Sequence, residues 1–106
     1  MNSCRQALSI LIATGQISIA QGGVLEDRGR TLLSRLCAGC HAVDKVGASP
    51  HRGAPPFRSI GDRYNISELT ERMTERLVST HPDMPDFQFS REDAKAVRAY
   101  LYSIQR

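Results

Sequence analysis

A long segment without regular periodicity constrains the fold of this chain more than any other feature. The stretch from Ala42 to Asn65 holds three prolines and three glycines, and its apolar residues follow a period of neither 2 nor 3.6. An irregular segment of about two dozen residues is unusual inside a compact domain. The whole chain has 106 residues with three Phe, three Tyr and no Trp, so bulky side chains are few. We therefore expect this segment to wrap a group that is not protein.

The first 20 residues have the pattern of an export signal. Arg5 precedes an uncharged, mostly apolar stretch over residues 7–19, and small residues stand at Ser18 and Ala20, where a signal peptidase reads the chain. The apolar stretch is shorter than a membrane span requires, which favours a cleaved signal over an anchor. The sequence thus predicts cleavage after Ala20 and a single periplasmic domain over residues 21–106, with no transmembrane span.

The charge of the chain is small and dispersed. Fourteen basic and eleven acidic residues give a formal net charge of +3, and the arginines are scattered among acids instead of forming a basic run with aromatics between them. With 41% hydrophobic and 24% charged residues, the composition is that of a small globular protein and not of a disordered chain. We expect no nucleic-acid partner.

Three amphipathic helices are predicted, and no strand. The first runs from Leu25 into Cys37, the second starts at Ser67 as N-cap and is ended by Pro82, and the third starts at the capping box of Ser90 and continues to the end of the chain. Their apolar faces carry, in chain order, Leu25, Leu32, Leu33, Leu36, Ile66, Leu69, Met73, Leu77, Ala94, Val97, Leu101 and Ile104.

The pentapeptide Cys37-Ala38-Gly39-Cys40-His41 has the C-x-x-C-H spacing of c-type haem attachment. Two thiols one helical turn apart can each form a thioether with one edge of the porphyrin, and the histidine that follows is then held under the iron as proximal ligand. The small residues between the cysteines let the ring approach the backbone. Together with the export signal, this motif predicts a covalently bound haem c.

Three other uses of the same residues compete with haem. A redox-active dithiol expects a βαβ context, which the sequence lacks. A zinc site needs four ligands, and His41 adjoins Cys40 too closely for both to bind one ion easily with Cys37. A disulfide between the two cysteines would close too short a loop to stabilise much.

The second axial ligand of a haem iron has four candidates in this sequence. Met84 leads, because its thioether suits low-spin iron and two prolines stiffen its loop. His81 is the alternative, and would otherwise interact with the C-terminal dipole of the second helix. Met73 is in register with the apolar face of that helix and is expected in the core. His51 is expected to be a solvated loop histidine.

Beyond this motif, the chain resembles a small bacterial class I cytochrome c across essentially all of residues 21–106. In that family a glycine eight residues before the first haem cysteine lets the first and last helices cross closely, and Gly29 stands there; Tyr100-Leu101 resembles the aromatic-leucine pair of the last helix. Leu33 departs from the family, which commonly has an aromatic at its position. The resemblance implies an all-α cytochrome c fold, with three main helices and long loops around one haem c held by two thioether links.

The resemblance also implies roles for single residues. The carbonyl of Pro55 would accept a hydrogen bond from His41, which would fix the tautomer of the ring. Arg63 would pair with a haem propionate, with Tyr64 and Arg58 as weaker alternatives. The segment that begins at Met84 resembles the distal-ligand loop of the family.

These features imply an electron carrier and not an enzyme, with a low-spin haem bound by His41 and Met84. Its partners would be redox proteins such as a dehydrogenase, a reductase or a terminal oxidase. The chain would act as a monomer or as a subunit of a redox complex, and a partner could hold it at the membrane surface. Two alternatives remain open: a dedicated electron-transfer subunit of a larger dehydrogenase or oxidase, and a pentacoordinate haem sensor or peroxidase. The exposed haem edge would be surrounded by an apolar patch of Ala38, Ala42 and Val43 with charges at Arg35, Lys45 and Arg52.

Overall fold

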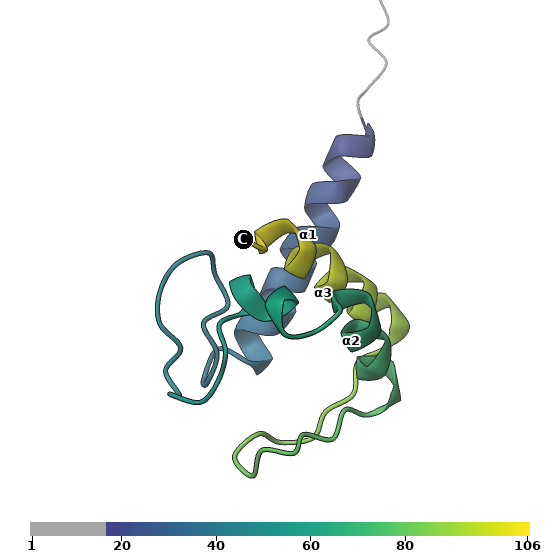
Figure 1. Cartoon of the computed structure of the whole chain (residues 1–106). Coiled ribbons are helices and arrows are strands. Elements are labelled where there is room, and N and C mark those ends of the chain that lie inside the picture. Colours follow the sequence, from purple (N-terminus) through teal and green to yellow (C-terminus); the bar gives the residue numbers. More distant parts are fainter. Residues whose placement is uncertain (1–16) are drawn as a thin grey trace, which may run out of the picture.

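Three α-helices and two short 3-10 helices form the regular structure of residues 17–106, the part of the chain that the computed structural model describes (Figure 1). They follow in the order α1 (Ile17–Leu36), η1 (Phe57–Asp62), α2 (Ile66–Arg72), η2 (Met73–Glu75) and α3 (Arg91–Ile104). Within these residues there is no strand, and the single β-type pairing is an isolated antiparallel bridge between Leu77 and Phe87. The prediction of an all-α fold is confirmed.

Helices α1 and α3 cross near the middle of the molecule (Figure 1). Gly29 of α1 lies at this crossing. A Cβ atom at Gly29 would collide with the carbonyl oxygen of Ala96 and lie 2.9 Å from the Cβ of Tyr100. The side chains of Leu33 and Leu101 are buried beside the crossing. The predicted role of Gly29 is confirmed, and Leu33 fills its position with an aliphatic side chain.

Helix α1 begins eight residues earlier than the apolar pattern indicates. The sequence predicts a start at Leu25, whereas the helix starts at Ile17 and contains the expected cleavage site after Ala20. No proline interrupts residues 17–24, so nothing there forces the backbone out of the helical conformation. The rest of the expected export signal, residues 1–16, lies outside the described residues, and cleavage remains a prediction.

Both ends of α2 differ from the prediction. Asn65 is the N-cap, and its side-chain oxygen accepts the backbone N–H of Glu68 at 3.0 Å. Ser67 instead bonds the hydroxyl of Tyr102 at 2.7 Å. The helix tightens into η2 and stops at Arg76, whose φ of 67° is incompatible with continuation. Leu77 and Pro82 therefore lie in a loop and not at the end of a helix.

Helix α3 agrees with the prediction. Ser90 is the N-cap, with its hydroxyl accepting the backbone N–H of Asp93 at 3.1 Å, which is the first half of the predicted capping box, and the predicted apolar face is buried. The carboxylate of Asp93 pairs with Arg28 of α1 at 2.7 Å, which adds a polar contact to the helix crossing. No helix within residues 17–106 is long and apolar enough to cross a membrane.

The predicted irregular segment is folded by side-chain and main-chain contacts, with η1 as its one regular element. The backbone N–H of Ala42 donates to Ser49 Oγ at 3.0 Å, and its carbonyl accepts the N–H of Phe57 at 2.9 Å. Gln105, just after α3, donates to the Phe57 carbonyl and accepts the N–H of Gly61, each at 2.8 Å. The bonds of Ala42 close the segment on itself, and the bonds of Gln105 tie η1 to the end of α3.

Candidate functional site

The C-x-x-C-H motif continues α1 by one turn. The N–H of Cys37 donates to the Leu33 carbonyl at 2.8 Å, and the Cys37 carbonyl accepts the N–H groups of Cys40 at 3.1 Å and His41 at 2.9 Å. This coil places the two cysteines one turn apart, as the spacing predicts. Both side chains are half-buried and neither forms a disulfide.

Burial determines the protonation of Cys37. Desolvation, with a smaller contribution from the neighbouring Cys40, raises the pKa of the Cys37 thiol to about 11. The thiol is therefore neutral at pH 7. Catalytic dithiols depend on a thiol of lowered pKa, and burial shifts the pKa of Cys37 in the opposite direction.

The ring of His41 is fixed by two contacts. Its Nδ1 lies 2.8 Å from the carbonyl oxygen of Pro55, and its face stacks on Phe57 with ring centroids 4.6 Å apart. A carbonyl oxygen only accepts, so Nδ1 carries the proton and Nε2 of the neutral ring keeps its lone pair. His41 is thus oriented with one nitrogen available to a metal. Phe57, for which the sequence pattern predicts no role, lies two residues after Pro55.

Met84 lies in the loop between η2 and α3, which extends away from the helices at the bottom of Figure 1. Its side chain is half-buried, and its N–H closes a turn with the His81 carbonyl at 3.1 Å. Met73 is buried in the hydrophobic core, as predicted. The expectation that His81 interacts with the end of a helix is wrong, because α2 and η2 end before Arg76 and His81 is exposed in the loop.

The loop that carries Met84 contacts the irregular segment through His51. Nε2 of His51 lies 3.1 Å from the Asp83 carboxylate, and its ring meets that of His81 edge to face at 5.5 Å. His51 is a partly exposed loop histidine, so the expectation that it is solvated holds in part, but its ring is also paired with Asp83. The paired residues are 32 positions apart with no motif around them, so no sequence signal could have identified the contact.

Three residues were predicted near the haem propionates. Arg58 donates to the carbonyl of Gly47 at 2.7 Å, so its guanidinium already braces the irregular segment. Arg63 and Tyr64 follow η1 and are exposed, and neither side chain forms a hydrogen bond or ion pair with the described part of the chain. Arg63 thus has a charge available for an anionic group.

The apolar patch predicted around the motif is wrong in two of its three residues. Ala42 and Val43 are buried, because the backbone turns inward after His41 toward the helix crossing. Exposed apolar side chains near the motif in sequence are instead Leu36 and Val46. The predicted rim charges are all exposed: Arg35, Lys45 and Arg52.

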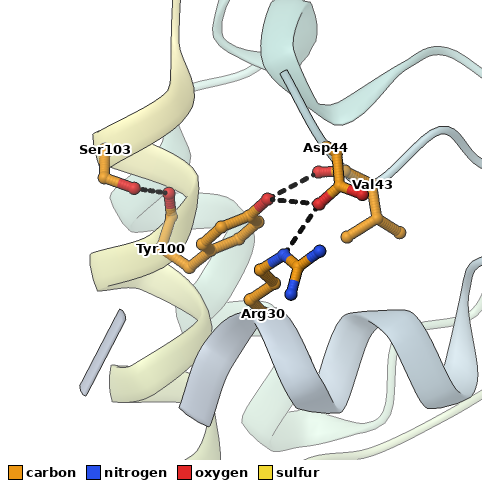
Figure 2. A network of polar contacts seen from close by, with 5 residues as sticks. All are labelled: Arg30, Val43, Asp44, Tyr100 and Ser103. Carbon is orange, nitrogen blue, oxygen red and sulfur yellow. Dashed lines mark hydrogen bonds and ion pairs between the residues drawn. The ribbon is translucent and has the colours of Figure 1, made fainter. Parts of the chain in front are cut away.

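A polar network fixes the chain just after the motif (Figure 2). The hydroxyl of Tyr100 in α3 donates to the Val43 carbonyl at 2.9 Å and lies 3.4 Å from Asp44, which also accepts from Arg30 of α1 at 2.8 Å. The hydrogen bond from Arg30 lowers the pKa of Asp44, and burial raises the pKa of Tyr100. Both crossing helices therefore hold the segment that follows His41.

The described residues fit haem better than the other ligands considered. Within residues 17–106, no group of three or more His, Cys, Asp or Glu side chains could hold one metal ion, which argues against a zinc site. Two unlinked thiols one turn apart, with an oriented imidazole directly after them, match the attachment chemistry of haem c.

Comparison with known proteins agrees with this chemistry. Residues 26–105 match the family model described as Cytochrome c. Cytochrome c-552 of Bradyrhizobium diazoefficiens is 29% identical over 100 residues, which cover 94% of this chain and 94% of that protein. No solved structure gives a significant match. The chain therefore belongs to the cytochrome c family, as a small monohaem class I member, a haem protein that carries electrons.

Proposed function

We propose that this protein is a periplasmic electron carrier with one haem c, bound through thioethers to Cys37 and Cys40 and ligated by His41 and Met84. The observation that carries the proposal is the 2.8 Å contact between His41 Nδ1 and the Pro55 carbonyl, because it leaves Nε2 of the ring to the metal. A haem bound there supplies one-electron exchange between ferrous and ferric iron.

The residues around His41 set its properties as a ligand. The Pro55 carbonyl holds the proton of the imidazole at Nδ1 and raises the basicity of the other nitrogen. Phe57 supports the ring face and lies in the hydrophobic core, so the ring cannot rotate freely. Together the two residues keep His41 in one tautomer and one orientation.

Met84 is the proposed second ligand. Its half-buried thioether lies in a loop whose base is bonded to the core, whereas Met73 is committed to packing against α3. A sulfur ligand in a site that excludes water favours the reduced, less charged iron and so a relatively high potential. A filled sixth position also disfavours the sensor or peroxidase alternative, which needs a position open to its ligand.

Arg63 is the proposed partner of a haem propionate. Its exposed guanidinium follows η1, whose first residue, Phe57, supports His41. A planar guanidinium pairs with a carboxylate through two hydrogen bonds. Arg58 is the weaker candidate because it already bonds the Gly47 carbonyl.

The visible spectrum of the exported protein tests the ligands. The reduced protein should show the band of a doubly thioether-linked haem, and the ferric protein should show the weak far-red band of methionine ligation. Met84→Ala should lose the far-red band. The matched control Met73→Leu conserves volume in the core and should keep it.

Other spectra would revise the proposal. A far-red band that persists in Met84→Ala would exclude this methionine as the ligand. A ferric protein without the band whose spectrum changes in His81→Ala would give the sixth position to His81, and an open site would move the function to sensing or peroxidase chemistry.

Cell fractionation tests the location and the partner. The haem protein should be recovered from the periplasm with Gln21 as its first residue. Recovery as a free monomer would support a diffusing carrier, and stable co-purification with a dehydrogenase or oxidase would favour the dedicated-subunit alternative. A haem protein that retains residues 1–20 in the membrane fraction would contradict cleavage.

A further inference from the structure

The loop that carries Met84 is firmly bonded at its base. Leu77 and Phe87 exchange two backbone hydrogen bonds, of 2.8 and 3.3 Å, and the N–H of Phe89 donates to the Met73 carbonyl at 2.7 Å. The Gln88 side chain adds a bond to the Thr74 carbonyl at 2.9 Å. These contacts leave the loop tip, residues 78–86, to be positioned by other means.

The loop tip has its own internal turn. Met84 N–H donates to the His81 carbonyl at 3.1 Å, and Asp83 N–H donates to His81 Nδ1 at 3.2 Å. Pro82 occupies the second position of this turn, which its fixed φ favours. Asp83 and Met84 belong to the same hydrogen-bonded turn, so a contact that restrains Asp83 also restrains Met84.

Within residues 17–106, one side-chain hydrogen bond joins the loop tip to a segment outside its own loop, whereas the ion pair of Asp86 with Arg76 at 3.2 Å stays within the loop. The bond between the two segments runs from Nε2 of His51 to the Asp83 carboxylate at 3.1 Å, beside the edge-to-face contact of the His51 and His81 rings. The two loops concerned approach each other at the lower left of Figure 1. The tip is therefore held to the irregular segment chiefly through His51.

His51 is itself fixed to the haem-attachment motif. The backbone N–H of His51 donates to the Cys40 carbonyl at 3.0 Å. Its Nδ1 accepts the N–H of Gly53 at 3.1 Å, so the proton of the neutral ring is on Nε2, which faces Asp83. The ring is thus oriented as a donor by bonds that do not involve the loop tip.

We propose that His51 is a positioning residue for the axial methionine: its hydrogen bond to Asp83 holds the Met84 loop closed against the segment that carries Cys40. The inference rests on the proposed ligation by Met84. His51 does not touch the iron and acts through the loop tip. Without this bond the loop opens more often, and an external ligand competes more successfully with the thioether.

Imidazole binding to the ferric, haem-bearing protein measures this opening. The apparent affinity of an external ligand is proportional to the population of the open state. Both partners are partly exposed, so removing the bond should strengthen imidazole binding about two- to fivefold, the range that such pairs supply. His51→Ala and Asp83→Ala should each show this gain, and their double variant should show no more than either, because one bond is lost in all three.

Two further variants separate positioning from general destabilisation. Asp83→Asn keeps an acceptor and should bind imidazole about as weakly as the unaltered protein. Arg28→Ala removes a comparably exposed ion pair between α1 and α3, at the helix crossing. It should lower the unfolding midpoint as His51→Ala does, but leave imidazole affinity unchanged.

Each outcome decides the inference. Equal imidazole affinity in His51→Ala and Arg28→Ala would overturn the positioning role of His51. The proposed ligation by Met84 would still stand in that case, provided that Met84→Ala loses the far-red band. A far-red band that survives in Met84→Ala would overturn both. A gain confined to the His51 and Asp83 variants supports the positioning role.

Discussion

Replacement of Gly29 by alanine tests the central packing contact of the fold. The new Cβ would lie 2.7 Å from the Ala96 carbonyl carbon and 2.9 Å from Tyr100 Cβ, and would overlap the Ala96 oxygen. Ordinary contacts between carbon atoms are about 3.5–4.0 Å. Most of the atoms met are backbone, so no side-chain rotation relieves the overlap and α1 must move away from α3.

The expected loss of stability follows from two opposing effects. Overpacking of this kind costs about 3 kcal/mol at the upper end of its range. Alanine is favoured over glycine inside a helix by about 1 kcal/mol. Gly29→Ala should therefore destabilise the protein by about 2 kcal/mol, which lowers the guanidinium chloride midpoint by about 0.7 M at a slope of about 3 kcal/mol per M.

Gly23→Ala is the matched control in the same helix. A Cβ at Gly23 meets nothing within 4 Å, so only the helix propensity changes and stability should rise by up to about 1 kcal/mol. Circular dichroism of the haem-bearing proteins during denaturant unfolding measures both variants. If Gly29→Ala were as stable as Gly23→Ala, the close crossing of α1 and α3 would be wrong.

Three more substitutions test the tertiary structure. Asn65→Ala should lower the free energy of unfolding by about 1 kcal/mol through loss of the α2 N-cap, whereas Ser67→Ala should change it by less than half as much; the reverse order would restore Ser67 as the cap. Tyr100→Phe should cost about 1–2 kcal/mol in denaturant unfolding, because a buried carbonyl loses its donor. Arg30 lowers the pKa of Asp44, so the pair stabilises the fold above the unfolded pKa of about 3.9 and its effect disappears as pH falls through the depressed folded value. The Tm of Asp44→Asn should accordingly lie slightly below that of the unaltered protein at pH 7, and the difference should disappear as pH falls through the depressed folded pKa of Asp44; a Tm difference independent of pH would contradict this reasoning.

Features that depend on neighbouring residues were predictable from the sequence. The motif from Cys37 to His41 coils as one turn because its hydrogen bonds span three or four residues. The start of α3 follows from the Ser90 hydroxyl and an N–H three residues later, and its buried face follows from the helical period. Gly29 and Pro55 were found through the family resemblance, which supplies the long-range information that spacing lacks.

Tertiary structure decided the features that join distant segments. The end of α2 was mispredicted because the backbone turns at Arg76, which lets Leu77 pair with Phe87. The helical spacing of apolar residues continues through this turn, so the sequence pattern does not indicate where the helix ends. Val43 was expected on the surface, yet it is buried where its carbonyl meets Tyr100. The bond between His51 and Asp83 likewise exists only once two loops are folded against each other.

The division has a physical cause. The sequence by itself determined the haem-attachment motif, the candidate ligands and the helical class, because each depends on residue types a few positions apart. Which partner a loop histidine finds, and where a helix stops, depend on contacts between segments far apart in the chain. Those contacts arise from packing on the crossing of α1 and α3, and only the folded chain brings them together.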